Sequence, residues 1–119
     1  METKNAVIEE TMLGTEDHGL MTAFIHLDYG GAGQSFGGYG FDEPIKDEDG
    51  KFLRRVGTAY GCEFIRRVLE TLGVDRWEDL KGTHCRVKAE HRKVYAIGHI
   101  IKNKWFSPSD LAAEMRLDS

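Results

Sequence analysis

The side chains with the clearest potential for chemistry are cations gathered toward the C-terminal end of the chain. Residues 81–104 hold seven Lys or Arg and a single acid, Glu90, which gives this segment a net charge of +6. The other residues carry nine basic and nineteen acidic side chains, a net charge of −10. Clustered cations produce a local positive field whatever the total charge of the protein. The segment therefore predicts a surface that binds an anionic partner.

Alternating residue types predict how this segment presents its charges. A strand is expected over His84–Glu90, with its three apolar residues facing the core. Because neighbouring side chains on a strand point to opposite faces, Arg86 and Lys88 are then expected to face solvent. A two-residue tip at 91–92 and a long second strand over residues 93–103 complete a basic hairpin.

Cations beside aromatic rings are typical of proteins that bind single-stranded nucleic acid with little sequence preference. We therefore expect phosphates to contact the cations of this hairpin and bases to stack on its aromatic rings. The predicted binding residues are Arg86, Lys88, Lys93, Tyr95, Lys102, Lys104 and Trp105. The alternative is a hairpin whose lysines only keep it soluble and protect a sheet edge from aggregation.

A second possible function comes from the acidic stretch at residues 42–50, which holds five acids and one lysine. It belongs to a polar segment, residues 42–57, that is expected as a surface loop with a short strand within residues 51–56. The simplest interpretation is a solvated run of charge. The alternative function is a protein-interaction module that binds a basic site on another protein through this acidic surface. The same acids could also fold over the basic hairpin and neutralise it.

The glycine-rich segment at residues 30–40 could be taken for a phosphate-binding or nucleophile motif. It lacks the Gly-Lys-Ser/Thr ending of a Walker loop. Residues 33–37 match G-x-S-x-G, but a nucleophile elbow leads from a strand into a helix, and here a strand is expected to follow. A hairpin turn is therefore expected, and an enzyme that uses this turn with His26 and Asp28 is the third alternative.

Five histidines and two cysteines raise the question of a metal site. The chain contains no HExxH motif and no pair of CxxC motifs, which are the usual spacings of zinc ligands. No metal, cofactor or catalytic residue is therefore predicted. Cys62 and Cys85 are expected to be reduced packing residues.

The elements around these residues follow from patterning. Strands are expected over residues 5–13, 20–29 and 34–42, with turns at 14–19 and 30–33. Helices are expected from the N-cap Thr58 to Leu72, ended by Gly73, and from Ser107-Pro108 onward, with a short turn opened by a capping box at 75–78. The order strand–strand–strand–helix–strand–strand–helix predicts an α+β fold, either an antiparallel sheet or a small OB-like barrel of about five strands with one long helix packed on it.

Length and composition limit the possible classes of protein. A chain of 119 residues, 40% apolar and 30% charged, is expected to form a single domain. No apolar run approaches the roughly 18 residues that a membrane-spanning helix needs, and residues 1–5 lack the apolar stretch of a signal peptide. We therefore expect a cytoplasmic protein with no membrane partner. The oligomeric state stays open.

Five short motifs are spread along most of the chain: LDYGG at 27–31, FGGY at 36–39, GTAYG at 57–61, FIRR at 64–67 and KWF at 104–106. In this combination the chain resembles a family of small uncharacterised proteins of bacteriophages and prophages. The resemblance implies a phage origin and a location in the cytoplasm of the host bacterium, with no catalytic residue to carry over. The order of elements also resembles that of phage recombination-accessory proteins, which implies single-strand binding. In size and acidity the chain is similar to small phage proteins that inhibit host defences, which implies the alternative of a host-defence inhibitor acting through its acidic surface.

Overall fold

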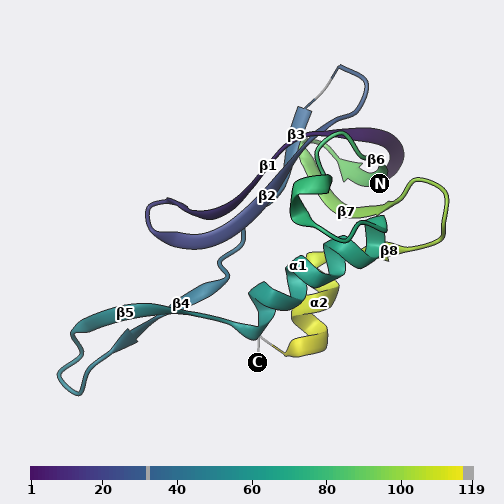
Figure 1. Cartoon of the computed structure of the whole chain (residues 1–119). Helices are drawn as coiled ribbons and strands as arrows, with labels where there is room; N and C mark the ends of the chain where they lie inside the picture. The colour runs from purple at the N-terminus through teal and green to yellow at the C-terminus, as the bar shows by residue number, and fades with distance from the viewer. Residues whose placement is uncertain (32, 117–119) are drawn as a thin grey trace.

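The computed structural model describes residues 1–31 and 33–116 and has an α+β fold (Figure 1). A six-stranded antiparallel sheet has the strand order β3-β2-β1-β6-β7-β8. Its strands are β1 (Glu2–Asp17), β2 (Leu20–Asp28), β3 (Gly33–Gly37), β6 (His84–Glu90), β7 (Lys93–His99) and β8 (Trp105–Phe106). A separate two-stranded sheet comprises β4 (Asp42–Lys46) and β5 (Phe52–Gly57). The helices are α1 (Ala59–Leu72), the short 3₁₀ helix η1 (Trp77–Asp79) and α2 (Pro108–Met115).

Strand β1 connects the two halves of the large sheet. Its first residues pair with β6 and its remaining residues pair with β2. The prediction that it ends at Leu13 before a turn at 14–19 was wrong. Gly14 pairs with Thr22, so the hairpin ladder continues, and the turn comprises only His18 and Gly19, both with positive φ. Strand β3, at one edge of the sheet, contacts β7, which lies next to the other edge. The sheet is therefore curved, and its two edges approach each other.

The core is built around one aromatic ring of α1. Phe64 is 1% exposed, and its ring centroid lies 4.9 Å from that of Phe41 and 5.0 Å from that of Phe106. Phe36 of β3 stacks on the same ring at 5.9 Å. The inward face of β2 closes this core with Ala23, Ile25 and Leu27, and Tyr29 just after the strand is buried as well. A single helix thus holds both edges of the sheet together.

The helix termini follow the predicted signals. The Thr58 hydroxyl accepts a hydrogen bond from the Gly61 backbone N–H at 3.2 Å, and Gly73 ends α1 in the left-handed conformation with φ 74°. Ser107 caps α2 with Pro108 as its first residue. The predicted capping box at 75–78 was wrong, because η1 begins after Arg76 and no side chain caps it.

Three segments differ from the predicted elements. The strand expected over 34–42 ends at Gly37, because Gly37 and Gly38 both have positive φ and turn the chain out of the sheet. Residues 42–57 form the β4–β5 hairpin and not a loop with one short strand. The strand expected over 93–103 ends at His99, where residues 100–104 turn back to pair β8 with β7.

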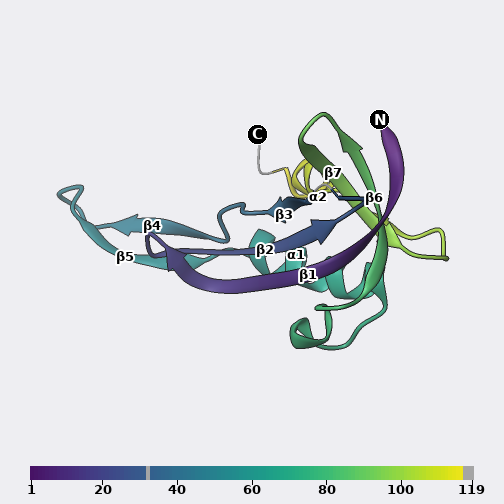
Figure 2. The same ribbon diagram turned by 90° about the horizontal axis from the view of Figure 1, so that it is seen from above.

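The β4–β5 hairpin, which we call the arm, projects from the body of the protein (Figure 2). The molecule is elongated, with principal extents of 51 × 30 × 28 Å. In the part of the chain that the structure describes, neither helix has the length and apolarity needed to cross a bilayer.

Candidate nucleic-acid interface

Five of the predicted binding residues lie on β6, β7 and β8, and Lys102 and Lys104 lie on the turn between β7 and β8; we call this set of residues the basic surface. Cys85 and Val87 are fully buried, and Ala89 is 7% exposed, so the alternation predicted for β6 is confirmed. Arg86 and Lys88 therefore lie on the opposite face, as expected. The register sets Arg86 opposite Gly98, and Gly98 opposite Trp105, in one row across the three strands.

Trp105 is the centre of this surface. Its ring covers Gly98 so closely that a Cβ atom on that residue would stand 2.6 Å from the Cε3 of the ring. The Nζ of Lys88 lies 4.4 Å from the Trp105 ring centroid, and the guanidinium carbon of Arg86 lies 4.8 Å from it. A cation over an indole face is attracted by the ring's quadrupole. The ring therefore fixes two cations side by side, a contact that the sequence analysis did not predict.

Arg86 also holds the turn that follows β7. Its Nε donates to the His99 carbonyl at 2.7 Å, and its Nη2 donates to the Lys102 carbonyl at 2.8 Å. The His99 Nδ1 accepts the backbone N–H groups of Ile101 and Lys102, at 3.0 and 2.9 Å. These four hydrogen bonds set the path of residues 99–104. Lys102 and Lys104 on this turn are exposed, and Lys104 lines a hollow with Trp105 and with Arg67 and Glu70 of α1.

Tyr95 and Lys93 form a second cation–ring pair at the far end of β7. The Nζ of Lys93 lies 4.9 Å from the Tyr95 ring centroid, and the tyrosine is 37% exposed. A register shift between Lys88 and Ala89 falls opposite this part of β7. A hollow of about 280 Å³ lies between this pair and Trp105, lined by both rings, Lys88 and the start of α2, including Asp110.

The electrostatics of the basic surface differ from those of the rest of the chain. Among the residues that the structure describes, the ion pairs within 4.0 Å involve neither Arg86 nor Lys88, Lys93, Lys102 or Lys104. Lys81 of the same segment does pair, with Glu10 at 2.9 Å. The acidic arm does not cover this surface, because it projects from the opposite end of the molecule (Figures 1 and 2). The five cations therefore carry charge that no acid of the described residues compensates within 4.0 Å.

The other candidate sites gain less from the structure. His26 contacts Ser35 at 3.4 Å and Glu9 at 3.7 Å. Within residues 1–31 and 33–116 there is no group of three or more side chains able to hold a metal ion. The glycine-rich turn includes Ala32, which lies outside the described residues. Ser35, His26 and Glu9 thus form an exposed row across β3, β2 and β1, in which His26 Nδ1 faces the Ser35 hydroxyl and Nε2 faces the Glu9 carboxylate.

The two cysteines have different surroundings. Burial raises the pKa of the Cys85 thiol to about 12, so this group stays protonated and unreactive at neutral pH. Cys62 is exposed near the start of α1, where a packing residue was expected. Both are free thiols, as predicted.

Comparison of the chain with protein-family models, with curated proteins and with solved structures finds no match. A functional assignment therefore depends on the geometry and charge of the site.

Proposed function

We propose that this protein is a non-enzymatic, phage-encoded module that binds single-stranded nucleic acid through the basic surface. The observation that carries the proposal is the set of five cations on adjacent strands and one turn, none of them in an ion pair within the described residues. Phosphate contacts supply most of the affinity of sequence-independent binders, and lysine and arginine make them.

The residues have different roles in this proposal. The lysines that contact phosphates are Lys88, Lys93, Lys102 and Lys104. Lys88 and Lys93 lie over aromatic rings, and the ion pairs of the described residues do not involve Lys102 or Lys104. Arg86 mainly positions the others, because two of its donors already bind carbonyl oxygens. Tyr95, with its partly exposed ring, offers a stacking face, and Trp105 orders the cations and presents its remaining exposed edge.

The connectivity is compatible with an OB-like barrel. Strand β1 pairs with both β2 and β6, β2 pairs with β3, β6 pairs with β7, and β3 lies beside β7. A helix follows the third strand of this set, as in OB-folds, and the arm is then an insertion before it. OB-folds commonly bind oligonucleotides on the face of their second and third strands. Here β2 carries His26 and Asp28 outward, beside Glu9, so the cations of β6–β8 are the more favourable surface.

Fluorescence anisotropy with a labelled oligothymidine tests the proposal over a salt series. Four lysines on phosphates give a slope of log K against log salt of about −3, at roughly 0.7 per contact on a single strand. The triple variant K88Q/K102Q/K104Q is expected to lose binding and flatten that slope. The matched control K46Q/K51Q changes lysines of the arm only and is expected to keep both the affinity and the salt slope of the wild type. Affinity that ignores salt, or that falls equally in the control, contradicts the proposal.

The arm favours a second candidate function, a protein-interaction module that inhibits a host defence protein. Phe52 and Leu53 are 61% and 59% exposed on a projecting hairpin with an acidic tip, which is unusual for apolar side chains of this size. Asp47 is needed for the turn, because its Oδ1 accepts the N–H groups of Asp49 and Lys51 at 2.9 Å.

A pull-down from host lysate separates the two functions. The variant E48Q/D49N neutralises the tip and keeps the turn. Recovery of one host protein that this variant loses and that nuclease treatment leaves intact supports the second function. Recovery that nuclease abolishes supports nucleic acid instead.

A further inference from the structure

A hollow within the basic surface is formed by four elements of the fold. It has a volume of about 280 Å³, and its walls come from β6, β7, β8 and the first turn of α2. Lys88, Tyr95 and Trp105, which the proposed function already uses, line it. So do Ser109 and Asp110 of α2, which that function does not use. Small-molecule sites begin at roughly 300 Å³, so a hollow of this size suits a single planar group.

A β-bulge aims the Tyr95 ring at this hollow. Ala89 pairs with Val94, and Lys88 pairs with Ala96, so Tyr95 is the extra residue of β7 between the two pairs. A bulge changes the direction of a side chain, and bulges are frequent next to functional sites. Neighbouring residues of a regular strand face opposite sides, but here both Tyr95 and Ala96 line the hollow.

The α2 side of the hollow carries hydrogen-bonding groups. The hydroxyls of Ser107 and Ser109 lie 3.2 Å apart, and the Asp110 backbone N–H donates to the Ser107 hydroxyl at 3.4 Å. The Asp110 carboxylate takes part in none of the ion pairs within 4.0 Å in the part of the chain that the structure describes. An ionised carboxylate only accepts hydrogen bonds, and it repels phosphate. On a surface of cations and rings it therefore suits a ligand group that offers donors.

The bases differ in the donors that they offer to a carboxylate. The Watson–Crick edge of guanine presents N1–H and the N2 amino group side by side, so a carboxylate can accept both, and the adjoining O6 can accept from a hydroxyl. Adenine and cytosine present a ring-nitrogen acceptor beside their amino group, and thymine and uracil present a carbonyl on each side of N3–H. Those acceptors would face the carboxylate without a donor, which is costly.

We propose that this hollow binds one unpaired guanine base, so that the protein prefers single strands that contain guanine. The base stacks on Tyr95, its Watson–Crick edge bonds to Asp110 and a serine hydroxyl, and Lys88 contacts its phosphate. The inference rests on the proposed nucleic-acid binding and goes beyond it, because phosphate contacts alone carry no sequence information.

Fluorescence anisotropy with oligothymidines that carry one central guanine, adenine or cytosine tests the proposal. A single guanine is expected to tighten binding roughly tenfold, since a hydrogen bond to a charged group is worth at least that factor, and adenine and cytosine are expected not to. Inosine lacks the 2-amino group and should lose most of the gain. The altered atom of 7-deazaguanine lies away from the Watson–Crick edge, so this base should keep the gain.

Free guanosine monophosphate distinguishes a base within a strand from a free nucleotide. It offers the lysines a single phosphate, so it is expected to displace the strand only at far higher concentration than the unlabelled strand does. Displacement at similar concentrations would assign the hollow to a free nucleotide and overturn the proposal.

The variant D110N isolates the carboxylate. It is expected to lose the preference for guanine and to keep the affinity for oligothymidine and its salt slope. An acid in the first turn also stabilises a helix, but a weakened α2 would lower binding to every strand alike. The matched control E90Q removes an acid of the same hairpin that lies outside the lining of the hollow, and it should keep the preference.

The outcomes separate this proposal from the function on which it rests. Equal affinity for all strands, a guanine preference that survives in D110N, or one that is lost in E90Q overturns the guanine site, while salt-dependent binding of oligothymidine still supports the basic surface. Absence of binding to every strand at low salt overturns the proposed function, and the guanine site with it.

Discussion

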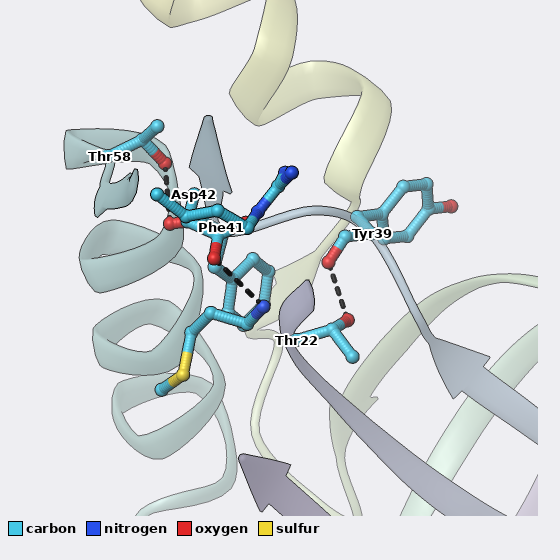
Figure 3. Close-up of polar contacts among 7 residues, drawn as sticks. Thr22, Tyr39, Phe41, Asp42 and Thr58 are labelled. Carbon is cyan, nitrogen blue, oxygen red and sulfur yellow. Dashed lines mark hydrogen bonds and ion pairs between the residues drawn. The ribbon is translucent and has the colours of Figure 1, made fainter. Parts of the chain in front are cut away.

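Two antiparallel hairpins of this protein have similar lengths and opposite surroundings. The β6–β7 hairpin lies between β1 and β8, so both of its edges are paired, and Val87 and Ile97 on its inner face are no more than 1% exposed. The arm pairs only with itself, and none of its eleven strand residues is buried. One hairpin is part of the core, and the other is held at its base alone, where the Thr58 hydroxyl donates to the Phe41 carbonyl (Figure 3).

The two hairpins differ in how firmly their side chains are held and in how open they are to a partner. Cations on β6 and β7 have fixed positions because the sheet and Trp105 hold them, which suits a surface that binds a regular array of phosphates. The acids of the arm stand away from the body on a hairpin with open edges, which suits contact with a large partner. The following predictions test whether the two regions are as independent as this comparison implies.

The largest expected effect comes from two phenylalanines, one in each region. Phe64→Ala removes the ring that joins Phe41, Phe36 and Phe106 and is expected to cost about 3–5 kcal/mol of unfolding free energy. Phe52→Ala in the arm is expected to change it by no more than about 0.5 kcal/mol, as exposed sites usually do. Urea denaturation measures both. A cost at Phe52 comparable to that at Phe64 would show that the arm is packed in solution.

A pair of glycines gives the next largest effect. Gly98→Ala places a Cβ against the Trp105 ring and is expected to cost about 1–3 kcal/mol, because the ring must move off the sheet. Gly57→Ala, at the end of the arm, meets nothing within 4 Å and is the matched control, with little change in the urea midpoint. Equal stability of the two variants would mean that Trp105 does not pack on β7.

These contacts also show why sequence predicted the two regions unequally. The alternation in β6 could be recognised in the sequence because every second residue of this strand faces the core. The limits of α1 could be predicted from Thr58 and Gly73 because helix capping is a local interaction. The arm faces no core, so its residues carry no alternating pattern, and residues 42–57 were taken for a loop.

The sequence was sufficient to predict that the cations are exposed. It did not predict which contacts fix their positions. Ile100 and Ile101 look like the continuation of a strand, yet Arg86 and His99 hold that segment in a turn through backbone hydrogen bonds. No spacing in the sequence signals such a contact between residues of different strands. The packing of Trp105 on Gly98 is also a long-range contact. It depends on β8, and a strand of two residues is too short to show an alternating pattern.

Two side chains that hold backbone groups are expected to produce intermediate effects. Arg86→Gln removes the donors to the His99 and Lys102 carbonyls and is expected to cost about 1.5–2 kcal/mol, at the low end of the range for hydrogen bonds to charged groups. Lys88→Gln loses a charge from the same surface with no such bonds and serves as the control. Denaturation measures the cost, and an unchanged midpoint in Arg86→Gln would mean that the turn does not depend on it.

Asp42→Ala tests the base of the arm in the same way. It leaves the Met21 N–H without its acceptor and frees Arg55, at an expected cost of about 1 kcal/mol. Hydrogen exchange is the sharper measurement, because faster exchange at the arm with unchanged protection in β6 and β7 indicates an independent arm. Faster exchange throughout both hairpins would contradict the comparison.

The smallest expected effect is a pH dependence that belongs to the body alone. Arg67 joins α1 to α2 through two hydrogen bonds with Glu114, which lower the pKa of that carboxyl below its ordinary value of 4.5. The folded protein therefore binds this proton less readily than the unfolded chain does, so the stabilisation is complete above the ordinary value and is lost as pH falls through the lowered one. The wild type should exceed Glu114→Gln in stability slightly at pH 7, and the difference should vanish in acid. Glu43→Gln in the arm, where none of the ion pairs seen in the described residues involves Glu43, should show no such difference at either pH. A difference for Glu114→Gln that persists in acid would mean that it arises from packing between the helices and not from the charge.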